Sequence, residues 1–213
     1  MGIFTIKYNK TTSPTAVHLI YFLKKYNLFV DNSKMSSNED IRYNADNVKS
    51  LNDVLQYKLI KFDYLNIIKF ISDLCLQILI MKKNNYGVLF IRLSDITVIN
   101  SNHYLFNPKE EYIHRLNGDD IDIKRPADVQ IPSDEVETKS FLSPEIIAFQ
   151  NIVSREPTKV NYVAVYFSLA LLILYVFDLN IEDDMKKIYN TNIYFFLKRC
   201  LNKNPSERVC LFV

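Results

Sequence analysis

Residues 160–177 read VNYVAVYFSLALLILYVF, a run of 18 residues without a charged side chain. A run of this length and hydrophobicity is either the central helix of a globular core or a membrane span. Asn161 and Ser168 are polar residues inside it, and no cluster of Lys and Arg flanks one of its ends. We therefore interpret the run as a buried helix and expect no membrane association.

On both sides of this run the sequence predicts further helices and a few short strands. Downstream, residues 188–201 predict an amphipathic helix with a buried stripe of Ile193, Phe196, Leu197 and Cys200. Upstream, helices are predicted from Ser13-Pro14 to about Tyr26, over 50–55 and over 62–82. Short strands are predicted at 3–8, 41–43, 87–91, 97–99 and 104–106. The polar segments 31–47 and 107–140 are interpreted as loops, the first with at most the short strand at 41–43.

The composition suits a folded globular protein and excludes several functions. The chain has 213 residues, of which 48% are hydrophobic, so one domain, or one domain with a small appendage, is expected, with a sizeable core. Its 3 glycines, Gly2, Gly87 and Gly118, lie far apart. A phosphate-binding loop needs clustered glycines so that backbone N–H groups can approach the phosphates. No Gly-rich nucleotide loop can be drawn.

Charge and cysteine usage point to an intracellular protein without a nucleic-acid partner. The net charge is only +2, with 24 acidic residues spread among the basic ones. The 3 cysteines lack the C-x-x-C spacing of a zinc site or redox motif, so a reducing compartment is expected, and the N-terminus does not resemble a signal peptide. Abundant Asn, Ile, Lys, Tyr and Phe without Trp suit AT-rich coding, as in large DNA viruses or AT-rich parasites.

Several passages, in the same order, resemble the helical lobe of the protein kinase fold. Residues 50–55 (SLNDVL) and 87–99 (GVLFIRLSDITVI) are similar to the helix after the kinase hinge and to the catalytic loop with its following strand. Residues 141–145 (FLSPE) resemble the Ala-Pro-Glu end of the activation segment, and 167–170 (FSLA) resembles the Trp-Ser-Leu-Gly of the central helix. Residues 197–208 (LKRCLNKNPSER) resemble the terminal motif that contains Cys-Leu, Pro and Arg.

The resemblance implies a kinase-like architecture of the α+β class, mainly α. It assigns residues 1–49 to a truncated N-lobe-like region and residues 50–213 to a helical C-lobe-like domain. Phe4 to Lys7 (FTIK) is similar to the Val-Ala-Ile-Lys strand. The chain would then begin at the third strand of the family's N-lobe, without the two strands that bracket the Gly-rich loop. Glu145 and Arg208 match the family's buried structural ion pair.

The chemical positions of the family are degenerate in this chain. Phosphoryl transfer uses a carboxylate that orients the hydroxyl nucleophile, an Asn and an Asp that hold Mg²⁺, and a Lys–Glu pair that places the phosphates. The resemblance assigns the carboxylate position to Arg92 and the Asn and Asp positions to Thr97 and Asn107. Lys7 would be a remnant of the Lys–Glu pair, because His18 occupies the position of the Glu. Arg cannot accept a proton, and neutral Thr and Asn are poor replacements for the anionic ligands of Mg²⁺.

The resemblance therefore implies a catalytically inactive pseudokinase that acts as a protein-interaction or regulatory module, with the kinase non-catalytic C-lobe domain as a close variant. We expect a protein partner, no cofactor, no bound ATP and a cytoplasmic location, which for a viral protein is the host cytoplasm. Segments 31–47 and 107–140 are the expected contact surfaces. Two alternatives stay open: an atypical active kinase that uses Asp95 and Lys7, and a virion structural or membrane-associated protein that inserts 160–177.

Overall fold

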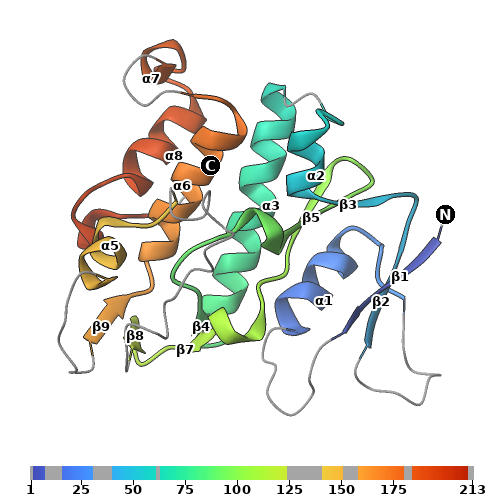
Figure 1. The fold of residues 1–213 in the computed structure, drawn as a ribbon, viewed down its shortest axis with the longest axis horizontal. Helices are drawn as coiled ribbons and strands as arrows, with labels where there is room; N and C mark the ends of the chain where they lie inside the picture. The colour runs from blue at the N-terminus through green and yellow to red at the C-terminus, as the bar shows by residue number, and fades with distance from the viewer. Residues whose placement is uncertain are drawn as a thin grey trace. The chain divides into compact units, whose positions relative to one another are not determined.

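The computed structural model describes residues 2–7, 16–30, 40–60, 63–123, 141–150, 158–179 and 184–210. The fold is mixed α+β, with more helix than strand and only small sheets (Figure 1). It divides into two compact units: unit 1 is Met1–Tyr86 with Ser94–Ile113, and unit 2 is Gly87–Leu93 with His114–Val213. The boundary that the resemblance implies, after residue 49, lies inside unit 1.

Unit 1 contains a two-stranded sheet covered by a helix. Strand β1 (Gly2–Lys7) pairs antiparallel with β2 (Asp40–Ala45), with Ile6 opposite Ile41. Helix α1 (Ala16–Lys25) places Leu19, Phe22 and Leu23 in the same apolar cluster as these two isoleucines. The predicted strands at 3–8 and 41–43 are confirmed, whereas the predicted helix start at Ser13-Pro14 lies outside the described residues.

A second sheet of unit 1 packs on its longest helix. Strand β3 (Val48–Ser50) pairs with β5 (Ile96–Ile99), which pairs with β6 (His103–Phe106), all antiparallel. Helix α2 (Leu51–Gln56) begins where the Ser50 hydroxyl accepts a hydrogen bond from the Asp53 amide at 3.0 Å. Helix α3 (Tyr64–Lys83) packs on α1 and β6 and begins after the Asp63 cap, and the predicted start at Phe62 lies outside the described residues. Short 3₁₀ turns η1 (Leu93–Asp95) and η2 (Glu110–Tyr112) flank the β5–β6 hairpin in sequence.

Helix α3 is long and apolar enough to cross a bilayer, and among the described residues it is the one helix with that property. The core helices of globular proteins share this property. Asp73 and Gln77 are both fully buried within α3. The Gln77 amide nitrogen donates to the Tyr104 carbonyl, and its amide oxygen accepts from the Phe106 amide, each at 2.9 Å. These bonds tie α3 to β6 along the strand.

Unit 2 is built around a nearly uniformly buried helix, α6 (Ala164–Val176). The apolar run at 160–177 thus divides into the end of strand β9 (Thr158–Asn161) and a helix of 13 residues. Helix α8 (Asn192–Cys200) packs on α6 with the predicted stripe of Ile193, Phe196, Leu197 and Cys200 buried. The remaining elements are β7 (His114–Arg115), α5 (Pro144–Gln150), α7 (Asp184–Lys187) and η4 (Pro205–Glu207).

Two sequence predictions are wrong at the level of local structure. The predicted strand over 87–91 is only β4 (Tyr86–Gly87), after which the chain is irregular but buried, and the Ile91 amide donates to the Ser168 hydroxyl at 2.9 Å. The predicted loop over 107–140 contains strand β8 (Asp120–Ile123), which pairs with β9. The sequence of β8, Asp-Ile-Asp-Ile, alternates, so Ile121 and Ile123 are buried while Asp122 is exposed.

Candidate functional site

The residues that the resemblance assigns to catalytic positions are distributed between the two units. Arg92 belongs to unit 2, where it lies between β4 and η1 and is 1% exposed. Thr97 belongs to unit 1 and is half-buried in β5, opposite Ser50 on one side and Leu105 on the other. Asn107 directly follows β6, and its amide donates to the Asp95 carbonyl at 2.7 Å. Asp95 itself is 3% exposed, so its side chain is enclosed by protein.

Lys7 and His18 have different surroundings. Lys7 is exposed at the end of β1, opposite Asp40 in the sheet register. His18 is 1% exposed on α1, and its Nε2 lies 2.9 Å from the Phe106 carbonyl oxygen. A carbonyl only accepts hydrogen bonds, so Nε2 carries the proton in this contact. His18 therefore joins α1 to β6.

The structure brings together Glu145, in the first turn of α5, and Arg208, which follows η4. The Arg208 Nη1 donates to Glu145 Oε1 and its Nη2 donates to Oε2, the second at 2.9 Å. The Arg208 side chain is fully buried and that of Glu145 is 22% exposed. Two parallel charge-assisted bonds of this kind are the strongest geometry for an Arg–carboxylate pair.

Further contacts fix the Arg208 guanidinium in place. Nε donates to the Asn202 carbonyl at 2.7 Å, and Nη2 also donates to the Lys203 carbonyl at 3.3 Å. The guanidinium carbon lies 4.9 Å from the centre of the Phe167 ring, on α6. Arg208 thus connects α5, α6 and the segment after α8 within unit 2.

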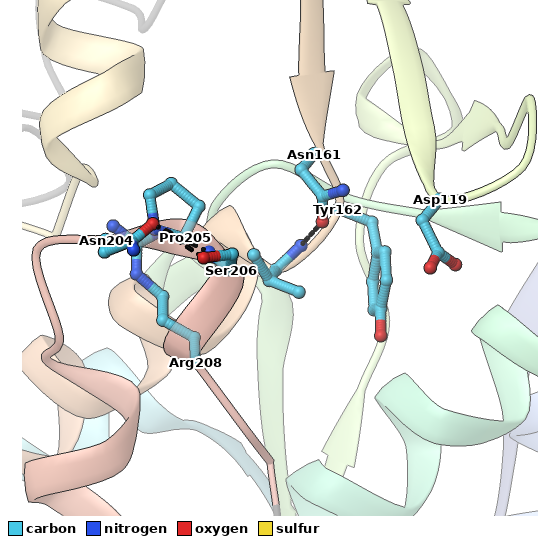
Figure 2. Close-up of a pocket in the computed structure, with 8 residues that line it drawn as sticks. Asp119, Asn161, Tyr162, Asn204, Pro205, Ser206 and Arg208 are labelled. Carbon is cyan, nitrogen blue, oxygen red and sulfur yellow. Dashed lines mark hydrogen bonds between the residues drawn. The ribbon is translucent and has the colours of Figure 1, made fainter.

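A depression of about 430 Å³ lies beside Arg208. Figure 2 shows Asn204, Pro205 and Ser206 on one side and Asn161, Tyr162 and Asp119 on the other. Asn161 is committed to local contacts, since its Oδ1 accepts from the Val163 amide and its Nδ2 donates to Asp120, both at 3.2 Å. The Ser206 amide and hydroxyl donate to Asn204 Oδ1. The lining is therefore mostly neutral and polar, with one carboxylate from Asp119 besides the neutralised Arg208.

Unit 1 contains a second polar cluster, of Tyr26, Lys69, Asp73 and His103. The Tyr26 hydroxyl donates to Asp73 Oδ1 at 2.5 Å, and the Lys69 ammonium lies 2.6 Å from the Tyr26 hydroxyl and 2.5 Å from Asp73 Oδ1. Asp73 Oδ2 also accepts from the Tyr104 amide at 3.1 Å. The buried carboxylate therefore receives bonds from Tyr26, the residue after α1, from α3 and from β6.

Burial sets the protonation behaviour of this cluster. It raises the pKa of the Tyr26 hydroxyl, and the hydrogen bond to Asp73 raises it further. Burial lowers the pKa of Lys69, with Asp73 acting in the opposite direction. Burial and then the charge of Lys69 lower the pKa of His103, whose ring lies 4.2 Å from that of Tyr26. These pKa directions suit a cluster that holds α3, β6 and the end of α1 together.

The sequence did not predict the cluster around Asp73 or the depression beside Arg208. Asp73 and Gln77 interrupt the apolar face of a predicted helix, which is the signal that could have identified them. Asn161 likewise interrupts an apolar run. Within the described ranges, no group of three or more His, Cys, Asp or Glu side chains could hold a metal ion.

Comparisons with known proteins add no relative to these observations. No protein-family model matches the chain, and no curated protein matches it. The resemblance to protein kinases therefore stays a prediction from the sequence passages at 50–55, 87–99, 141–145, 167–170 and 197–208.

Proposed function

We propose that this chain is a catalytically inactive relative of the protein kinases that acts as a protein-binding module. The observation that carries the proposal is Arg92, a buried cation at the position that the resemblance assigns to the catalytic carboxylate. A guanidinium stays protonated at every pH at which the protein is folded, so it cannot accept a proton from a substrate hydroxyl. According to the proposal, the chain has lost the catalytic residues of the family and has kept its fold.

Retention of the scaffold is supported by the contact between Glu145 and Arg208. The family pattern pairs a carboxylate below the activation segment with an Arg near the last helices, and the two residues at these positions bond through both guanidinium nitrogens of the fork. Selection for a stable fold explains such a pair without any catalytic role, because removal of one partner leaves an unpaired buried charge.

Nucleotide binding tests the proposal directly. A ligand present at a hundred times its Kd stabilises a protein by about 2.7 kcal/mol, which raises the Tm of a chain of this size by roughly 5–10 °C. We expect no change in Tm with millimolar ATP and Mg²⁺, and no transfer of labelled phosphate to a generic protein substrate. A Mg²⁺-dependent shift that disappears in Lys7→Ala would contradict the absence of bound ATP and would favour the atypical kinase.

The surfaces through which this module would bind are only partly described. The segments 31–39 and 124–140 lie outside the described residues. Of the expected contact surfaces, the described part contains β2 and β8, which are committed to antiparallel pairs with β1 and β9. A different surface of unit 2, formed by α7 and α8, exposes aromatic side chains.

A further inference from the structure

The face formed by α7, the turn after it and α8 exposes a group of aromatic rings. Tyr189 is 61% exposed and Phe195 is 43% exposed, and Tyr194 lies between them. The ring centres of Tyr189 and Tyr194 are 5.1 Å apart, those of Tyr194 and Phe195 are 5.3 Å apart, and both pairs meet edge to face. Each ring has only two side-chain torsions, so the group is ordered at low entropic cost.

The packing of α8 explains why these rings point outward. The buried stripe of α8 faces α6, which leaves Phe195 on the other side of the helix. The turn between α7 and α8 returns through the hydrogen bond from the Tyr189 amide to the Lys186 carbonyl at 3.3 Å, and this turn carries the Tyr189 ring to Tyr194. The aromatic group therefore belongs to the junction of α7 and α8, whose course Figure 1 shows and whose turn is held by backbone hydrogen bonds.

Basic side chains accompany the rings on α7 and α8, next to an acidic stretch that ends at Asp184, the first residue of α7. Residues 185–201 contain Lys186, Lys187, Lys198 and Arg199 and no Asp or Glu, although the net charge of the whole chain is only +2. The nearest acidic residues in the sequence are Glu182 to Asp184, which precede this stretch. All three lysines are exposed, and the Lys198 ammonium lies 5.9 Å from the centre of the Tyr194 ring. We call Lys186, Lys187, Tyr189, Tyr194, Phe195 and Lys198 the aromatic–lysine face.

We propose that the aromatic–lysine face docks an acidic peptide segment of a protein partner, with Asp or Glu residues on both sides of an apolar side chain. The lysines supply point charges that suit carboxylates on a flexible chain, whereas a bidentate site for a phosphate favours Arg. The rings supply the apolar area. This inference deepens the proposed protein-binding function and names the partner's chemistry.

Charge and ring geometry favour a peptide over the other anionic partners. Bases of a single-stranded nucleic acid stack in series on parallel aromatic faces, but the rings here stand at 65° and 77° to one another. A helix that lies on an anionic membrane needs a continuous apolar face. Two of the three rings on this face are tyrosines with polar hydroxyls, and Phe195 is its one wholly apolar side chain.

Fluorescence anisotropy with a labelled peptide of sequence EDELFEDE tests the proposal on the full-length chain. We expect saturable binding that weakens with added salt, because exposed charges are screened over about 10 Å at 0.1 M. The double variant Lys186→Glu/Lys187→Glu should weaken binding about tenfold or more, and Phe195→Ala should also weaken it. The matched control is Lys82→Glu/Lys83→Glu, a lysine pair in the last turn of α3, which should bind as the wild type does.

Several outcomes would overturn the inference. Equal binding of a QNQLFQNQ peptide would remove the charge argument, and equal loss of binding in both double variants would show a general charge effect. Tighter binding of an oligothymidine or of phosphatidylserine vesicles through the same residues would assign the face to another partner. The probe has no hydroxyl-bearing residue, so its binding is independent of phosphoryl transfer, and failure here leaves the proposed loss of catalysis to its own assay.

Discussion

Glu145 and Arg208 lie 63 positions apart in the sequence and meet through two parallel hydrogen bonds, with the guanidinium fully buried. Three elements of unit 2 depend on this contact, because Arg208 also bonds to two backbone carbonyls and lies over Phe167.

Replacing Glu145 with Ala should lower the free energy of unfolding by about 3 kcal/mol. Loss of one partner of a buried ion pair costs about 3–5 kcal/mol, and the partial exposure of Glu145 favours the lower end. Urea denaturation measures the change. The control is Glu111→Ala, an exposed carboxylate whose loss should change stability by less than about 0.5 kcal/mol. Equal stability of the two variants would show that the pair is dispensable.

Replacing Gln77 with Leu should destabilise unit 1 by about 2–4 kcal/mol. The side chain is buried, and its loss leaves the Tyr104 carbonyl and the Phe106 amide without the bonds that it makes to them. Each unsatisfied buried group costs about 1–3 kcal/mol. Gln56→Leu, at the exposed end of α2, makes the same chemical change without this loss. Similar urea midpoints for both variants would contradict the bridging role.

The stability of the protein should fall as the pH drops below about 6.5, in part through His103. Burial and Lys69 lower the pKa of the folded His103 below its ordinary value of 6.5, so the unfolded chain binds the proton more readily. The contribution of His103 is therefore complete above pH 6.5 and is lost as the pH falls through the folded pKa. In His103→Gln the dependence of unfolding on pH between about 7.5 and 5 should become flatter. An unchanged pH profile would assign the effect to other groups.

Replacing Ser168 with Ala should cost about 1–3 kcal/mol, because the buried Ile91 amide loses the hydroxyl that accepts its hydrogen bond. Ser94→Ala, at an exposed position in η1, is the matched control. Amide hydrogen exchange gives a second readout, since the Ile91 amide should exchange faster in Ser168→Ala. Wild-type protection of that amide in the variant would mean that another group accepts its hydrogen bond.

The sequence predicted the elements whose periodicity is strong. The buried stripe of α8 and the long helix α3 are confirmed, because apolar residues recur at helical spacing over several turns. Strand β8 was missed because its four residues lie among turn-forming residues, although their alternation was present in the sequence. The run after Gly87 was misinterpreted because β-favouring residues also fill buried irregular segments, where a side chain such as that of Ser168 satisfies the backbone.

The sites were less predictable than the elements. The pairing of Glu145 with Arg208 was expected from the resemblance to a family motif, and such a motif carries long-range information that periodicity lacks. In the cluster around Asp73, Tyr26 bonds to a carboxylate 47 positions away, and nothing local to Tyr26 indicates this partner. The residues of the aromatic–lysine face can be read from the sequence. Their exposure and ring contacts cannot, because these depend on which side of α8 packs inward.

The division of the chain between the units limits how the protein can be synthesised and cut. The chain passes from unit 1 to unit 2 after Tyr86, returns after Leu93 and leaves again after Ile113. A ribosome must therefore release β5 before β3 has a neighbour in its sheet. Similarly, the Ile91 amide has no Ser168 hydroxyl to bond to until the ribosome has added 77 more residues. No single cut separates the two units, so proteolysis between them would leave at least one unit incomplete.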